Sequence, residues 1–315
     1  MTRIVSLLPA ATEIVGALGL ASELVGVSHE CNFPPEVNRL PRVTRCEIHD
    51  SGLSSAAIDR WVSEQLAKSG TLYTMDEDLL RRLQPDVILT QRLCDVCAVG
   101  YDSVLSLAST LPGPPRVVNL APSCLNDIFE DIQRVAGALN EPAKGERLVD
   151  ALKARVDRVK TIAERADSRP LCFLMEWIDP PFCSGHWVPE LVEIAGGVDP
   201  LGRKGLDSLR IPWATICATA PDIIVLACCG YTIERTVQDL PILRSQPGWN
   251  ELPAVRTGRV YGVDGSAYFS RPGPRVVDGL EILASLIHPE LFSGAFPDRG
   301  VIHLSPAQTA ATVSV

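Results

Sequence analysis

The sequence predicts an α/β protein with two Rossmann-like lobes, each built on a parallel sheet, joined by one long backbone helix. Three observations predict this class. Short β-branched runs alternate with amphipathic helical patterns, which is typical of βαβ units. One long helical pattern without a strand signal divides the chain near its middle. The segments on its two sides also resemble each other.

The composition allows two such lobes and excludes several classes of protein. The chain has 315 residues, 46% of them hydrophobic and 21% charged, which suits a globular protein with a buried core. With 29 Lys and Arg against 38 Asp and Glu, the net charge is −9, which argues against a nucleic-acid partner. No apolar run reaches about 18 residues, so we expect no membrane span.

The first elements decide how the start of the chain is interpreted. Pro9 and Glu13 interrupt an apolar stretch that would otherwise resemble a signal peptide, and divide it into a strand over 3–7 and a helix over 10–18. We therefore expect a mature, cytoplasmic chain with reduced thiols. If the start is misannotated and an export signal precedes Met1, the protein would instead be periplasmic or membrane-associated.

The remaining elements follow in chain order. Strands are predicted over 24–28, 86–90, 116–120, 171–176, 222–227 and 259–263. Amphipathic helices are predicted over 57–70 and 124–140. The runs LQPDVILTQ (83–91) and TAPDIIVLA (219–227) share a helix end, a Pro-Asp pair and a buried strand, which supports two related lobes.

The long helix is predicted over 146–165. Apolar residues recur there at spacings of three and four, and no Gly or Pro interrupts them; they are Leu148, Leu152, Val156, Val159 and Ile162. We expect this helix to act as a strut between the lobes. The predicted units are an N-terminal α/β lobe over 1–141, the backbone helix over 142–167, a C-terminal α/β lobe over 168–298 and a loose tail over 299–315.

Candidate ligand-binding residues follow the predicted strands. Ligands of open parallel sheets bind beyond the carboxyl ends of the strands, and five loops of this chain place polar, aromatic or thiol groups there. The candidates are His29, Glu30, Trp177, Asp179, Phe182, His186, Trp187, Tyr268, Phe269 and Arg271. A satisfied structural histidine is an equally good interpretation of His186.

Five of the ten cysteines are candidate metal ligands. Cys94 and Cys97 have a spacing at which two thiolates can chelate one metal, and Cys31, Cys229 and Cys183 also follow strands. Zinc or an iron–sulfur cluster would need such additional ligands. Burial as small apolar side chains is the alternative, because free cysteine is often found in protein cores.

The aromatic residues of these loops suit a large, rigid, partly apolar ligand such as a corrinoid or another tetrapyrrole. The alternative is that Trp and Phe side chains only seal the two lobes together. Catalytic motifs are absent: the sequence has no G-x-S-x-G, no Walker loop and no H-E-x-x-H. Glu30 and Asp179 are the general acid or base candidates, and we assign no catalytic residue.

Several blocks of the sequence resemble one known family. RIVSLLPAATEIVGALGL, LVGVSHECNFPPEV, EWIDPPFCSGHWVPELVEIAGGVDPLG and YFSRPGPRVVDGL are similar to the cobalamin-type periplasmic substrate-binding proteins of ABC transporters, in the helical-backbone metal receptor superfamily. The resemblance covers residues 3–287. It implies two α/β lobes, one backbone helix, a ligand held between the lobes and an ABC transporter permease as partner. His-Glu-Cys and Leu-Cys-Asp-Val-Cys resemble a cysteine-bearing branch often described as cobalamin-binding.

Residues and resemblance together predict a protein that binds cobalamin, a related corrinoid or another metal complex in a cleft between its lobes. The alternative is a cytoplasmic enzyme or metal-centre protein with an iron–sulfur or zinc site built from Cys31, Cys94, Cys97 and further cleft cysteines.

Overall fold

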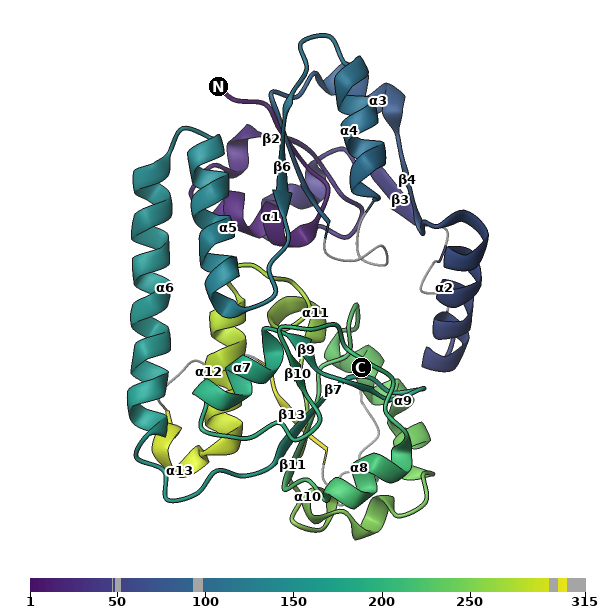
Figure 1. Cartoon of the computed structure of the whole chain (residues 1–315), viewed down its shortest axis with the longest axis vertical. Coiled ribbons are helices and arrows are strands. Elements are labelled where there is room, and N and C mark those ends of the chain that lie inside the picture. Colours follow the sequence, from purple (N-terminus) through teal and green to yellow (C-terminus); the bar gives the residue numbers. More distant parts are fainter. Residues whose placement is uncertain (47, 49–51, 93–98, 295–299, 305–315) are drawn as a thin grey trace.

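The computed structural model describes residues 1–46, 48, 52–92, 99–294 and 300–304. Two α/β lobes lie one above the other, and a long helix runs along one side of both (Figure 1). We call the elements from β1 to α5 the N-lobe and those from β7 to β13 the C-lobe. The predicted fold class is confirmed.

The N-lobe is built on four parallel strands in the order β2-β1-β5-β6. The strands are β1 (Ile4–Ser6), β2 (Leu24–Val27), β5 (Val87–Gln91) and β6 (Arg116–Leu120). The helices of the lobe are α1 (Pro9–Ala17), α3 (Glu77–Leu83), α4 (Tyr101–Thr110) and α5 (Leu125–Ala138). Ile4, Ile88 and Leu89 are fully buried, as expected for apolar strands covered on both faces.

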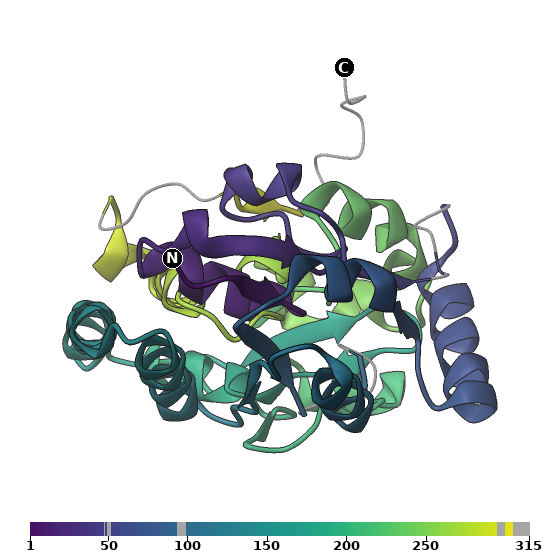
Figure 2. The same ribbon diagram turned by 90° about the horizontal axis from the view of Figure 1, so that it is seen from above.

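One excursion leaves the N-lobe. Strands β3 (Thr44–Cys46) and β4 (Tyr73–Met75) pair antiparallel, and the chain between them carries helix α2 (Ser55–Ser69). The helix starts at Ser54, whose side chain accepts the Ala57 N–H, and ends at Gly70, which has φ 68°. In both views α2 lies on the side of the molecule opposite to helix α6 (Figures 1 and 2).

The C-lobe sheet has the order β13-β12-β11-β7-β8. Its strands are β7 (Cys172–Trp177), β8 (Phe182–Cys183), β11 (Ile223–Leu226), β12 (Val260–Gly262) and β13 (Ile302–His303), with a separate pair β9 (Gly185–His186) and β10 (Arg203–Lys204). The central strands are parallel, whereas β8 and β13 are antiparallel to their neighbours. The helices are α7 (Val188–Ile194), α8 (Trp213–Thr219), α9 (Ile233–Arg244), α10 (Pro253–Arg256), α11 (Gly265–Tyr268), α12 (Val276–Ile287) and α13 (Pro289–Phe292).

Helix α6 (Pro142–Ala163) is the long helix predicted from the sequence. It begins four residues before the predicted 146, because Pro142 occupies the first turn and Gly145 lies inside the helix. A Cβ on Gly145 would lie 2.6 Å from the Cβ of Ala136, so this glycine allows close packing of α6 on α5. Arg155 of α6 also binds Asp278 and Glu281 of α12, at 2.5 and 2.7 Å.

The apolar core continues from one lobe into the other. Ile14 and Leu89 of the N-lobe belong to the same buried cluster as Leu174 and Leu280 of the C-lobe. The prediction of a loose tail over 299–315 is wrong for two residues. Ile302 and His303 form β13, which pairs with β12. None of the helices in the described ranges is long and apolar enough to span a bilayer.

Candidate functional site

The loops that follow strands β2 and β12 meet between the two lobes. Arg271, in the loop after β12 and α11, donates 2.7 Å to Asn32 Oδ1 and 3.0 Å to the main-chain oxygen of Glu30. Asn32 and Glu30 belong to the loop after β2. The carboxyl ends of the two parallel sheets therefore face each other, as predicted for the ligand-binding side of such sheets.

An ion cluster reinforces this junction. Arg275 binds both oxygens of Glu13 at 2.6 and 2.9 Å, and Arg271 lies 3.6 Å from the same carboxylate. The Glu13 side chain is only 2% exposed, and burial raises its pKa although the Arg275 guanidinium acts in the opposite direction. Sequence reasoning missed the pair Glu13 and Arg275. The signal was present, because Glu13 is the only charged residue of helix α1 and lies next to apolar residues that are buried.

Half-exposed aromatic rings lie beside this cluster. Phe33 is 40% exposed, and the guanidinium carbon of Arg275 lies 4.2 Å from the centre of its ring. The same guanidinium lies 5.8 Å from the ring of Tyr268. Tyr268 was predicted, whereas Phe33 was not, although it follows the predicted His29–Cys31 segment by two residues.

The carboxyl end of β7 contacts helix α2. Trp177 Nε1 lies 3.3 Å from the main-chain oxygen of Ser55 and 3.1 Å from that of Asp179. The Trp177 ring also packs against Tyr231 at 4.8 Å. Phe182 is half-buried, with the Arg210 guanidinium 5.8 Å from its ring. Residues predicted from this loop therefore line the junction between the lobes.

Two buried carboxyl groups, of Glu176 and Asp199, hold Ser184 and Gly185 in place. Glu176 accepts hydrogen bonds from the Gly185 N–H at 3.1 Å and the Ser208 hydroxyl at 2.5 Å. Asp199 accepts one from the Ser184 hydroxyl at 2.5 Å. Burial raises the pKa of Glu176 to about 7 and that of Asp199 to about 6. These carboxyls fix the shape of the loop from within.

His186, Trp187 and Phe269 differ in exposure. His186 has φ 51°, an uncommon conformation for a residue with a side chain, and its Nε2 lies 3.1 Å from Asp207 Oδ1. Trp187 is 4% exposed and donates to the main-chain oxygen of Phe269, which is 1% exposed. Trp187 and Phe269 therefore belong to the core, as in the alternative that aromatic residues seal the lobes.

His29 is held in place by its neighbours. Its Nδ1 lies 2.8 Å from the Thr44 hydroxyl, and its ring packs against Tyr73 at 5.3 Å. Burial lowers the pKa of His29, although Glu30 acts in the opposite direction, so the neutral imidazole is favoured. Glu30 itself is exposed.

The described cysteines of the predicted metal set do not converge. Cys31 is 1% exposed, lies 3.0 Å from Thr12 Oγ1 and belongs to the core, and Cys183 is fully buried. Burial raises the pKa of both thiols, which disfavours the thiolate that a metal needs. Cys229 is exposed at the end of β11, and Cys94 and Cys97 lie outside the described residues. Within the described ranges, no three His, Cys, Asp or Glu side chains are grouped to hold a metal ion.

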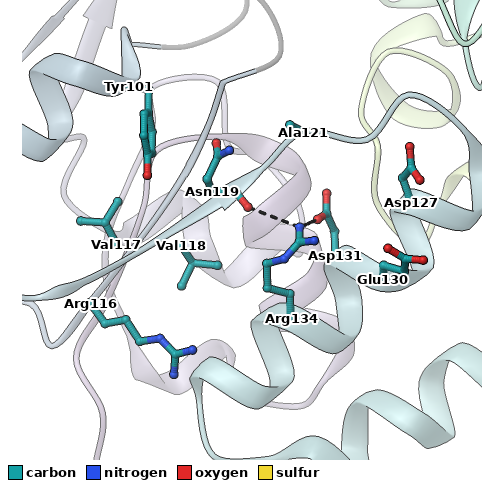
Figure 3. Close-up of a pocket in the computed structure, with 10 residues that line it drawn as sticks. All are labelled: Tyr101, Arg116, Val117, Val118, Asn119, Ala121, Asp127, Glu130, Asp131 and Arg134. Atoms are coloured by element: carbon teal, nitrogen blue, oxygen red, sulfur yellow. Dashed lines mark hydrogen bonds and ion pairs between the residues drawn. The ribbon is translucent and has the colours of Figure 1, made fainter.

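Two cavities lie away from the predicted site residues. One, of about 620 Å³, lies between β6 and α5 and includes Tyr101, Asn119 and Asp131 (Figure 3). Asp131 pairs with Arg134, and burial raises its pKa to about 7. The other, of about 670 Å³, lies between α5, α6 and α7. None of the sequence-predicted site residues in the described ranges lines either cavity.

Comparisons with known proteins agree with this architecture. Residues 4–267 match the family model described as periplasmic binding protein. The vitamin B12-binding protein of Vibrio cholerae is 22% identical over 290 residues, covering 89% of this chain and 86% of that protein. An uncharacterized ABC transporter substrate-binding lipoprotein, YvrC of Bacillus subtilis, is 24% identical over 302 residues, covering 92% and 81%. The crystal structure of a periplasmic heme-binding protein from Pseudomonas aeruginosa has a TM-score of 0.71 at 19% identity, covering 92% of this chain and 94% of that one.

Proposed function

Because the chain belongs to the periplasmic binding protein family, we propose that it is the substrate-binding protein of an ABC transporter and holds a corrinoid of the cobalamin type between its lobes. Two relatives support the two parts of this proposal. One is described as vitamin B12-binding, and the other as an ABC transporter substrate-binding lipoprotein.

One observation carries the proposal: strand-end loops from both lobes meet through Arg271, Asn32 and Glu30. A ligand between the lobes would contact both sheets at their carboxyl ends, where parallel sheets bind ligands. The continuous core and helix α6 restrict how far the lobes can separate. A largely preformed site of this kind loses little conformational entropy when it binds.

The exposed side chains of these loops suit a broad, flat ligand. Phe33 comes from the N-lobe, and Trp177, Phe182 and Tyr268 come from the C-lobe. All four are at least partly exposed. Aromatic rings present large, rigid, apolar surfaces, and a corrin ring presents two matching faces.

Three arginines beside these aromatic side chains favour a ligand with neutral side groups. Arg271 and Arg275 share Glu13, and Arg210 binds Asp59 at 3.0 Å. Each of these guanidinium groups is therefore already bound to oxygen atoms of the protein. Corrinoids carry amide side groups, whereas haem carries two carboxylates that need cationic partners. We therefore place corrinoids before haem.

Haem is the second candidate, because the Pseudomonas aeruginosa structure is described as heme-binding and shares the fold. Equilibrium dialysis of the full chain against cyanocobalamin, cobinamide and hemin separates the candidates. We expect saturable, one-to-one retention of cyanocobalamin at lower concentrations than hemin. Tighter retention of hemin would overturn the corrinoid assignment, and retention of none of the three would overturn the proposed function.

The relatives also bear on location. Members of the family named above are described as periplasmic or as a lipoprotein, and we extend this location to the present chain. The cytoplasmic location and the enzyme alternative raised from the sequence have no support in these relatives. Copurification of the chain with an ABC permease from detergent-solubilised membranes tests the transporter partner.

A further inference from the structure

Helix α2 reaches from the N-lobe onto the C-lobe. It stands between β3 and β4, and we call residues 55–69 the α2 arm. At its start, the Ser55 N–H donates 3.2 Å to Asp239 Oδ2 of α9. The oxygen of Leu53, just before the arm, accepts a bond of 2.6 Å from Arg235, also of α9. The arm therefore begins on the opposite lobe.

Contacts continue along the arm. Arg210 of the C-lobe binds both carboxylate oxygens of Asp59 at 3.0 Å and lies 3.3 Å from the Ser63 hydroxyl. Ile58 packs against the buried apolar cluster of the C-lobe. The two lobes are thus joined on both sides of the molecule: by α6 on one side and by the α2 arm on the other (Figures 1 and 2).

The attachment of the arm is light. Ser55 is its only buried residue, and the Arg210 side chain that holds Asp59 is 56% exposed. By contrast, five residues of α6 are buried, among them Val149, Leu152 and Val159. One ion pair with a largely exposed arginine and a few hydrogen bonds hold the arm, without the row of buried side chains that holds α6. The arm can therefore detach without unfolding of either lobe.

The arm also contacts the loop assigned to ligand binding. Trp177 donates to the main-chain oxygen of Ser55, and Arg210 lies over Phe182 while it binds Asp59. When the arm is docked, it therefore covers part of the loop from Trp177 to Phe182. When the arm leaves, these side chains are uncovered.

We propose that the α2 arm is a releasable latch that ties the two lobes together and limits how fast ligand enters and leaves the site between them. The gating part rests on the proposed function, whereas the latch itself does not. Detachment exposes both the arm and the loop under it, so one substitution should change protease access and ligand exchange together.

Tryptic cleavage after Lys68 tests the latch without any ligand. The test variant is Asp59→Ala, which removes the bond to Arg210 and replaces Asp with a better helix former. Glu64→Ala is the control, because Glu64 is an exposed acidic residue of the same helix that forms no ion pair with the described part of the C-lobe. We expect cleavage of Asp59→Ala to be about two- to fivefold faster than that of Glu64→Ala. Equal rates would overturn the latch.

Stopped-flow mixing with cyanocobalamin then tests the gate. We expect Asp59→Ala to raise the association and dissociation rates by the same factor and leave Kd unchanged, with no effect in Glu64→Ala. Faster cleavage with unchanged ligand rates would overturn the gate. If cyanocobalamin does not bind to either variant or to the unchanged protein, the proposed function fails, and the cleavage rates still decide whether the arm is a latch.

Discussion

Arg275 of the C-lobe and Glu13 of the N-lobe form a two-bond ion pair, with distances of 2.6 and 2.9 Å, across the junction of the lobes. The carboxylate is 2% exposed, and Arg271 lies 3.6 Å away from it. A buried charge is tolerated only when it is paired. The pair therefore fixes how helix α1 of the N-lobe sits against the start of helix α12 of the C-lobe.

Removing only one partner of this pair should destabilise the protein strongly. Arg275→Met leaves the buried Glu13 carboxylate with only Arg271, which is 3.6 Å away, as its cation. We therefore expect the free energy of unfolding to fall by about 3 kcal/mol. The double variant Glu13→Gln/Arg275→Met should lose less than Arg275→Met alone, because no buried charge is left uncompensated. Urea denaturation measures both. A double variant less stable than Arg275→Met would contradict this account.

The buried carboxyl of Glu176 should make stability depend on pH. Its pKa is about 7 in the folded protein against an ordinary value of 4.5, so the folded state binds the proton more tightly. Its contribution to the free energy of unfolding is full below pH 4.5 and is lost as the pH rises to about 7. Urea denaturation should show that the free energy of unfolding falls between pH 5 and pH 8, with a contribution of about 3 kcal/mol at most from Glu176.

Glu176→Gln should reduce that pH dependence, because an amide can keep both hydrogen bonds without a charge. Asp78→Asn is the control, since the Asp78 side chain is 84% exposed. If Glu176→Gln loses as much stability between pH 5 and pH 8 as the control, Glu176 is not the source.

Gly185 lies so close to the main chain of residues 206–208 that there is no room for a side chain. A Cβ at this position would lie 2.5 Å from the Ser208 nitrogen and 2.7 Å from the Leu206 oxygen. Gly185→Ala should therefore lower the free energy of unfolding by about 1–3 kcal/mol and displace the loop under His186. Gly137→Ala, in helix α5 with open space around the added atom, should be neutral or stabilising. Equal thermal midpoints for the two variants would refute the close approach.

Phe33 should contribute directly to ligand affinity. If its ring covers one face of a corrinoid, Phe33→Ala should weaken cyanocobalamin binding about three- to tenfold in calorimetric titration. Leu105→Ala is a matched control, because Leu105 is also 40% exposed but lies on α4. A similar loss in both variants would show that Phe33 has no special role.

The sequence predicts the sheet-forming parts of this fold well. The seven predicted strands all occur, because long β-branched runs between helices need two covered faces. Strands β3, β4, β8, β9, β10 and β13 were missed, since these short strands have little apolar pattern. The long helix was predicted to begin only after Gly145, because glycine is a poor helix former. The sequence does not reveal that Ala136 packs against Gly145 and requires a glycine there.

The site was predicted only in part. Strand ends led to Arg271, Trp177, Phe182 and Tyr268, which lie where the lobes meet, because carboxyl ends of parallel strands gather at one edge. Pairing between distant segments was not accessible, so Glu13 with Arg275 and Asp59 with Arg210 emerged only from the fold. The position of a residue after a strand also does not reveal whether its side chain is exposed. Cys31 and Phe269 both follow strands, and both are buried.

Hydrogen exchange of the full chain with and without saturating cyanocobalamin tests the central claim most directly. A ligand held between the lobes should slow amide hydrogen exchange in both lobes: in the loop 28–34 of the N-lobe and in the segments 177–187 and 264–271 of the C-lobe. Slower exchange in one lobe only, or confined to the cavity between β6 and α5, would contradict it.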